Sequence, residues 1–129
     1  MEVKFLHWLE ELSKDHGDLV GKKCANLGEL TNGGFPVPPG FALSLDAYDA
    51  FLDGTGVIGE IQRFFATFEA DPMNPKELGK YSEAAAHVQS LMESTGMPAE
   101  MEAAVAERYD ALCDRVGVND VKVAVRSAG

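Results

Sequence analysis

The pattern of apolar and polar positions predicts a chain built mainly from amphipathic helices. Apolar side chains recur at helical spacing over residues 57–68, 77–94 and 98–116, and polar residues fill the positions between them. A shorter helix is expected over about 23–31, where apolar residues again recur three apart. The Asn-Gly-Gly run at 32–34 should end that helix, because glycine tolerates the left-handed conformation of a helix C-terminus.

A proline-rich break follows this helix. Residues 35–40 should not be helical, because their prolines fix φ and remove backbone donors. Residues 41–44 alternate like a strand. A helix over 47–52 should come next, with Gly54 stopping it.

The two ends of the chain add further extended segments. Residues 3–9 fit either a short strand or the start of a helix, and 13–18 are expected to form a loop. Residues 121–125 alternate β-branched and other side chains, which predicts a strand. The fold class expected from these patterns is α/β or α+β, rich in helices and with about three short strands.

Composition narrows the classes of partner. The 129 residues suit one domain, and 11 basic against 21 acidic side chains give a net charge of -10. So acidic a chain is not expected to bind nucleic acid or an anionic membrane, because both require a basic surface. A small anion needs only local positive charge, and residues 1–40, with four basic and six acidic groups, are the less repulsive region for it.

The expected cellular location and the state of the cysteines follow from features that the sequence lacks. Apolar runs stay well below the ~18 residues of a membrane span, and the N-terminus does not resemble a signal peptide. The two cysteines, Cys24 and Cys113, do not have the spacing of a zinc site or of a disulfide framework. A reducing, cytoplasmic location is therefore expected.

The first candidate for chemistry is Gly21-Lys22-Lys23, at the start of the helix over 23–31. A helix N-terminus presents unpaired N–H groups and the positive end of its dipole, so it attracts phosphate. Glycine lets the backbone approach a ligand closely, and lysine adds a mobile charge. By themselves these residues favour a solvated turn with two surface lysines over a phosphate site.

Other candidates are weaker on the residues alone. Arg126 follows the strand over 121–125, where ligands often sit in α/β sheets, but it also fits a surface ion pair. Cys24 reads as a packed helix residue and His87 as a surface histidine. The stripe of Phe64, Phe65 and Phe68 is expected to lie in the core.

Three segments together resemble a known family. They read VGKKCANLGEL at 20–30, GFPVPPGF at 34–41 and AVRS at 124–127. This is similar to the N-terminal domain of the phosphoenolpyruvate synthase and pyruvate phosphate dikinase family, which typically reads VGGKxANLxEL, GxPVPxGF and AVRS. Relatives of that family include phenylphosphate synthase and rifamycin phosphotransferase.

The resemblance implies a fold, an activity and a set of residues. The family's domain has an ATP-grasp-like fold that binds ATP with magnesium and passes a phosphoryl group to a histidine on a separate domain. That histidine then phosphorylates pyruvate or another acceptor, such as a phenol. By this resemblance, Lys23 takes the place of an ATP-contacting lysine and Arg126 that of a phosphate-contacting arginine. The ATP or phosphate-binding set is therefore Gly21, Lys22, Lys23, Arg126 and Ser127.

The chain also departs from the family pattern. Lys22 replaces the second glycine of the family's Gly-Gly-Lys, which removes backbone freedom and adds a charge. The magnesium ligands and the phosphorylated histidine of the family are expected outside these 129 residues. We therefore expect a partial nucleotide-binding domain, either excised or a natural small subunit, with little or no activity alone. Its expected parts are a phosphate-loop and strand segment (1–44), a helical segment (45–117) and a strand ending at Arg126 (118–129).

Two functions fit the sequence. The first is the ATP-binding segment of a phosphotransferase of this family, working with the rest of its nucleotide-binding domain and a phosphohistidine domain or subunit. The second is a non-catalytic helical module for regulation or assembly, in which the phenylalanine stripe would serve a partner interface.

Overall fold

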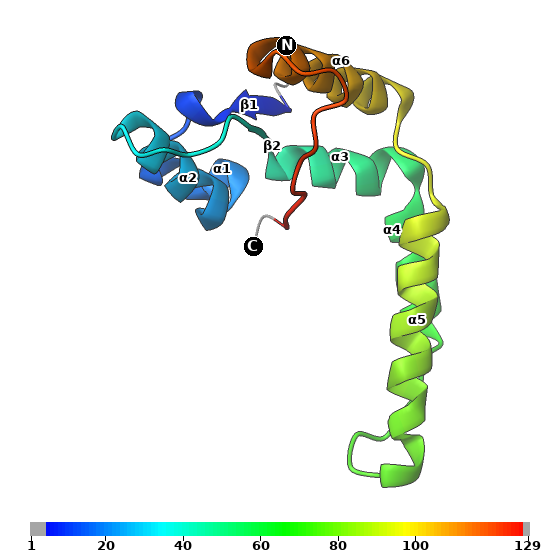
Figure 1. Cartoon of the computed structure of the whole chain (residues 1–129). Coiled ribbons are helices and arrows are strands. Elements are labelled where there is room, and N and C mark those ends of the chain that lie inside the picture. The colour runs from blue at the N-terminus through cyan, green and yellow to red at the C-terminus, as the bar shows by residue number, and fades with distance from the viewer. Residues whose placement is uncertain (1–4, 128–129) are drawn as a thin grey trace. The chain divides into compact units, whose positions relative to one another are not determined.

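The computed structural model describes residues 5–127 and consists mainly of helices (Figure 1). The chain divides into two units, which are described separately. The first unit contains the described residues up to Asp49 and those from Ala99 onward, and the second spans Ala50–Pro98. In chain order the elements are β1 (Leu6–Trp8), η1 (Leu9–Glu11), η2 (Lys14–His16), α1 (Gly17–Val20), α2 (Lys22–Asn32), β2 (Phe41–Leu43), α3 (Leu45–Thr55), α4 (Val57–Ala66), η3 (Pro75–Glu77), α5 (Leu78–Ser94) and α6 (Ala99–Val116).

A two-stranded sheet joins distant parts of the first unit. β1 pairs antiparallel with β2, with His7 opposite Ala42 in the register. The N–H of Ser44 donates to the carbonyl of Phe5 at 2.7 Å, and the N–H of Leu9 donates to that of Gly40 at 3.1 Å, so the pairing continues beyond both strands. The strand alternative for the first segment is confirmed, and a 3-10 turn follows it at once.

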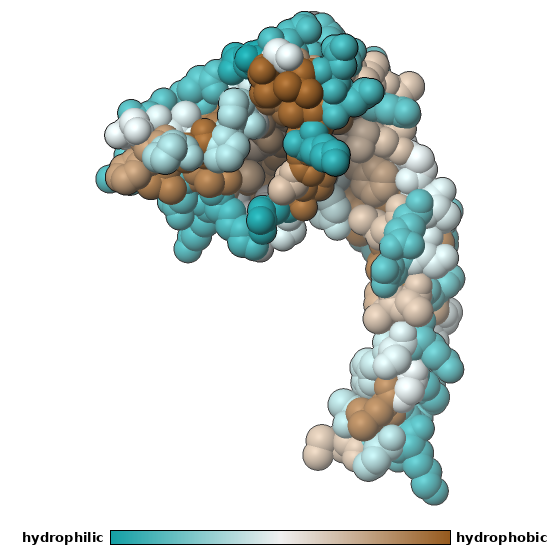
Figure 2. Space-filling view, viewed as in Figure 1, coloured by the Kyte–Doolittle hydropathy of each residue, from teal (hydrophilic) through white to brown (hydrophobic). Residues whose placement is uncertain are grey.

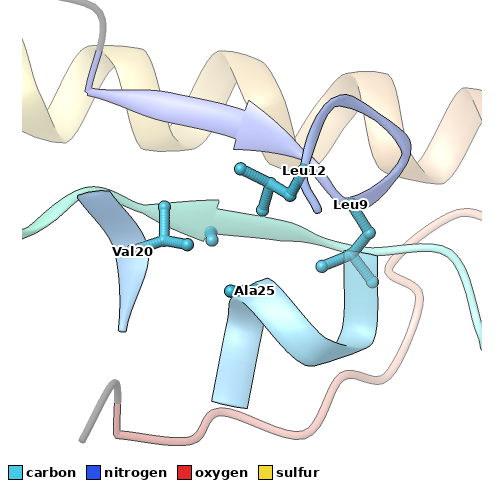
Figure 3. Close-up of a cluster of buried hydrophobic side chains, with 5 residues drawn as sticks. Leu9, Leu12, Val20 and Ala25 are labelled. Atoms are coloured by element: carbon cyan, nitrogen blue, oxygen red, sulfur yellow. The ribbon is translucent and has the colours of Figure 1, made fainter. Parts of the chain in front are cut away.

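The core of the first unit is a small cluster of aliphatic side chains from η1, α1, α2 and β2 (Figure 3). Leu12 and Val20 are essentially inaccessible, at 1% and 0% exposure. Burial of one such side chain stabilises a fold by about 1.5–3 kcal/mol. The cluster therefore fixes the short helix α1 and the first half of α2 against the sheet. Its members are Leu9, Leu12, Val20, Ala25 and Ala42.

The closest approach in this unit occurs at Gly28, on the face of α2 that meets Leu12. A Cβ at position 28 would lie 2.5 Å from the Cβ of Leu12 and 2.6 Å from its carbonyl oxygen. Asn32, one turn further along, donates from Nδ2 to the same carbonyl at 2.8 Å. Glu29 Oε2 accepts the N–H of Lys14 at 3.0 Å. One glycine contact and two hydrogen bonds thus hold α2 against residues 12–14.

The segment 13–18, expected to be a loop, is instead helical. It forms η2 and the start of α1, so that expectation is wrong. The reason is a reciprocal cap: the hydroxyl of Ser13 accepts the N–H of Asp15 at 3.3 Å, and His16 Nδ1 accepts the N–H of Ser13 at 2.9 Å. Polar residues that are typical of a loop therefore cap the backbone N–H groups of a tight helical turn.

The other helices mostly follow the sequence pattern. α2, α4, α5 and α6 lie where helices were expected, and Gly117 ends α6 with a φ of 78°. Gly54 does not stop α3, which runs on to Thr55. Gly56, with a φ of 75°, makes the break instead, because glycine adopts a positive φ at little cost.

The strand expected over 121–125 is absent from the structure. Residues 121–127 carry no helix or strand, and within the described residues no neighbouring strand pairs with them. Val125 is 90% exposed. A strand requires hydrogen bonds from a second strand, so the alternating pattern alone does not produce one. The contact recorded for this segment is the hydroxyl of Tyr109, which donates to the carbonyl of Val121 at 2.7 Å.

Helix α6 contacts β1 through a cation–π stack. The guanidinium carbon of Arg115 lies 3.6 Å from the centroid of the Trp8 ring, and that of Arg108 lies 4.8 Å from it. Arg115 also donates a hydrogen bond to the carboxylate of Glu10. Slight burial raises the pKa of Glu10, but the hydrogen bond from Arg115 and the charges of both arginines outweigh this effect. Together they hold the pKa of Glu10 below its usual 4.5.

We predict that Gly28→Ala lowers the free energy of unfolding of the first unit by about 1–3 kcal/mol, because the added methyl group overlaps Leu12. Gly54→Ala is the matched control, since a Cβ there meets nothing within 4 Å. It should stabilise α3 by up to about 1 kcal/mol. Urea denaturation followed by the fluorescence of Trp8, the sole tryptophan, measures the first effect, and circular dichroism follows the control. Equal stability of Gly28→Ala and wild type would contradict the contact.

We also predict that Glu10→Gln costs less than about 1 kcal/mol, because both partners of the Arg115 pair are partly exposed. The folded state lowers the pKa of Glu10, so its contribution is full above about pH 4.5 and is lost as the pH falls through the lower folded value. Unfolding free energies measured from pH 7 downward should therefore converge for the two proteins in acid. Glu107→Gln, on the exposed face of α6, should show no such convergence.

Candidate functional site

Gly21 is the single residue that joins α1 to α2. Its backbone has φ 86° and ψ 158°, a conformation that essentially only glycine adopts. Its N–H donates to the carbonyl of Gly17 at 2.9 Å, and its own carbonyl accepts the N–H of Ala25 at 3.1 Å. Gly21 therefore ends one helix and begins the next within a single residue.

The N-terminus of α2 is open to an incoming anion. No side chain caps this helix start, and its first turn contains no acidic residue. The N–H groups of a first helical turn have no partner inside the helix. Lys22 and Lys23 stand on this turn with exposed side chains. The geometry thus combines unpaired donors, the positive end of a helix dipole and two ammonium groups.

The anchoring of this helix start was not predicted from the sequence. Leu12, Glu29 and Asn32 hold the body of α2, and so set the direction in which its N-terminus points. The sequence predicts Asn32 only as part of the run that ends the helix. In the structure its side-chain amide donates a hydrogen bond to the carbonyl of Leu12, 20 residues earlier in the chain. A glycine followed by a glutamate and an asparagine on one helix face is the signal that could have indicated this contact.

Arg126 and Ser127 lie in the extended segment after Val121, and both are exposed. The structure records no hydrogen bond or ion pair between them and Gly21, Lys22 or Lys23. It therefore brings together the three residues at the start of α2, whereas the role of Arg126 and Ser127 in the same site stays a prediction.

The neighbouring thiol is a packing group. Cys24 lies partly buried against the aliphatic cluster, and this burial raises the pKa of its thiol. A raised pKa keeps the thiol neutral, which disfavours a role as nucleophile or metal ligand. Over residues 5–127, no group of three or more His, Cys, Asp or Glu side chains is placed to hold a metal ion.

Comparison with known families bears on this site. The family model described as "Pyruvate phosphate dikinase, AMP/ATP-binding domain" matches residues 17–129. The chain belongs to this family. The match begins with α1 and so includes the whole of α2 and its open N-terminus. The resemblance stated from the sequence is confirmed.

Curated relatives of the family cover nearly the whole chain. It is 39% identical over 126 residues to a probable phosphoenolpyruvate synthase of Methanothermobacter thermautotrophicus, which covers 98% of the chain and 18% of the relative. It is 39% identical over 128 residues to the phosphoenolpyruvate synthase of Aeropyrum pernix (99% and 15%). For the synthase of Pyrococcus furiosus the identity is 34% over 158 residues (99% and 19%). The chain thus spans less than a fifth of the length of these relatives.

No helix in the described part of the chain is long and apolar enough to cross a membrane.

We predict that Gly21→Ala destabilises the first unit by about 1–3 kcal/mol, because alanine is strained at this backbone conformation. Trp8 fluorescence in urea measures the loss. Asn26→Ala, on the exposed face of α2, is the control and should change stability by less than about 0.5 kcal/mol. A Gly21→Ala protein as stable as the control would show that the positive φ is not required.

Proposed function

We propose that this chain supplies part of the triphosphate-binding surface of an ATP-dependent phosphotransferase. The observation that carries the proposal is the uncapped start of α2, where Gly21 precedes two exposed lysines within a family described as AMP/ATP-binding. Backbone N–H groups and ammonium groups neutralise phosphate oxygens, and phosphoryl transfer depends mostly on positioning and charge neutralisation. Lys23 takes the role of the ATP-contacting lysine, and Lys22 adds charge beside it.

In this proposal the segment after Val121 completes the phosphate site. Arg126 provides a planar guanidinium, which binds phosphate oxygens in a bidentate way, and Ser127 provides a hydroxyl beside it. The proposed parts are the phosphate-loop and strand segment over 1–44, the helical segment over 45–117 and the segment over 118–129 that contains Arg126. They contribute to an ATP-grasp-like domain whose remainder lies outside this chain.

The proposed reaction follows the resemblance to the family. The γ-phosphoryl group of ATP passes to a histidine of another domain or subunit and then to an acceptor, pyruvate or another small molecule such as a phenol. The relatives named phosphoenolpyruvate synthase support pyruvate as the first acceptor to test. The reaction is assigned to the larger cytoplasmic enzyme, and the chain alone should be inactive.

Magnesium enters this proposal only as a companion of ATP. The described residues offer no group of three metal-ligating side chains, so they do not fit a protein-held magnesium site. The proposed ligands of the metal lie outside this chain.

A non-catalytic regulatory or assembly module is the second candidate. The exposed rings of Phe65 and Tyr81, at 48% and 40%, favour it, because exposed aromatic side chains are typical of protein interfaces. The two candidates differ in where the chain responds to ATP. Binding at α2 supports the first, and an α2 that does not respond to ATP supports the second.

We predict that ATP added to the chain shifts the backbone amide resonances of Lys22, Lys23 and Cys24. Lys23→Ala should weaken this binding about tenfold or more, because a charge-assisted hydrogen bond contributes about 1.5–3 kcal/mol. Lys76→Ala removes an equal charge from the second unit and should leave the affinity within twofold of wild type. Unchanged affinity in Lys23→Ala, or shifts that avoid α2, would contradict the proposed site.

A further inference from the structure

The hairpin of α4 and α5 exposes aromatic side chains that the sequence pattern assigns to the core. Phe65 is 48% exposed and Tyr81 is 40% exposed. Both rings contact that of Phe68, at centroid distances of 5.8 Å and 5.6 Å. Two packed helices bury only the faces that meet, so rings outside that contact remain at the surface. Figure 2 shows apolar residues among hydrophilic ones along this hairpin.

A surface cavity of about 480 Å³, open to solvent, lies where α4 and the loop after it meet α5. Aromatic rings form one wall, in which the centroid of the Phe64 ring lies 4.5 Å from that of His87 and 5.8 Å from that of Phe68, with the rings tilted against each other. Charged side chains from the connecting loop and from α5 line the rest. These charged residues are Glu69, Lys80 and Glu83.

The charges in this cavity do not balance. The ammonium of Lys80 is bound to the carboxylate of Glu77 at 2.7 Å, so Glu77, rather than Glu69 or Glu83, is its ion-pair partner. Glu69 and Glu83 have no ion pair or hydrogen bond within the described residues. The hydrogen bond to Glu77 and the charges of Glu77 and Glu69 raise the pKa of Lys80, so the surroundings favour a positive charge. Two carboxylates beside aromatic faces therefore remain available to a further cation.

We propose that this cavity binds an arginine side chain of a partner protein. A guanidinium stacks on aromatic faces and at the same time donates two parallel hydrogen bonds to a carboxylate. The rings of Phe64 and Phe68 supply the first contact, and Glu69 and Glu83 supply the second. The ammonium of lysine offers a compact point charge and matches this combination less well.

The surface around the cavity indicates a protein rather than a free small cation. The same hairpin carries exposed apolar side chains outside the cavity lining, with Leu78 53% and Met73 86% exposed. Residues 50–98 carry seven acidic and three basic side chains, so a partner with a basic, partly apolar face complements them. A second copy of this chain would bring like charges together. A purely apolar segment would bury Glu69 and Glu83 without partners, which is costly.

The experiment titrates the 129-residue chain with N-acetyl-arginine amide and follows the aromatic resonances of Phe64, Phe68 and His87. Saturable shifts are expected. N-acetyl-citrulline amide, a neutral analogue of similar shape, should bind at least tenfold more weakly. Equal binding of the two amides, or shifts that do not saturate, would overturn the proposal.

Variants then test the named residues. Glu69→Gln with Glu83→Gln should weaken binding of the arginine amide at least fivefold, whereas Glu60→Gln with Glu93→Gln, which removes equal charge elsewhere on the hairpin, should keep it within twofold. Phe68→Leu keeps an apolar side chain and should also weaken binding, with helicity checked by circular dichroism. Equal affinities in the two glutamine pairs would show non-specific attraction and overturn the assignment.

A final arm identifies the source of the arginine. The peptide N-acetyl-Leu-Arg-Leu-amide should bind at least fivefold more tightly than the arginine amide, because its leucines reach the apolar rim. Equal affinity would mean a free small cation, and concentration-dependent shifts without ligand would mean a second copy. Either result would overturn a partner protein as the occupant.

Discussion

The contact between α2 and Leu12 is the constraint on which the first unit depends. Gly28 lets the helix approach until no Cβ fits between the two backbones. At that distance Asn32 reaches the carbonyl of Leu12 and Glu29 reaches the N–H of Lys14. A helix held at three points in its second half cannot rotate about its axis. The direction of its first N–H groups, and hence the place of the proposed phosphate site, follows from this packing.

The same unit explains how an acidic chain can offer a site to an anion. The net charge of -10 acts over the whole molecule, but salt screens exposed charges beyond about 10 Å. Locally, the first turn of α2 has no carboxylate and two lysines, and its backbone contributes the positive end of the dipole. The electrostatic potential close to the start of α2 is therefore positive, although the net charge of the chain is negative.

The second unit offers negative charge, which suits a cation rather than an anion. Its carboxylates outnumber its basic groups and stand beside aromatic rings that the two helices leave uncovered. Helical periodicity predicted α4 and α5 well, but it did not predict that Phe65 and Tyr81 would be exposed. An apolar stripe in the sequence predicts which face of a helix can be buried. Whether it is buried depends on a further element that covers it.

The sequence by itself determined the longer helices, the glycine breaks around α2 and the family, because these depend on neighbouring residues and on ordered motifs. The α2 start at Gly21 was predictable for the same reason, since a glycine before two lysines is a local feature. The tertiary structure decided what depends on distant partners. Residues 121–125 have the alternation of a strand but no described strand to pair with, and 13–18 became helical through a reciprocal cap. Gly28 and Asn32 gained their roles only because folding brings Leu12 against α2, a contact that no local pattern encodes.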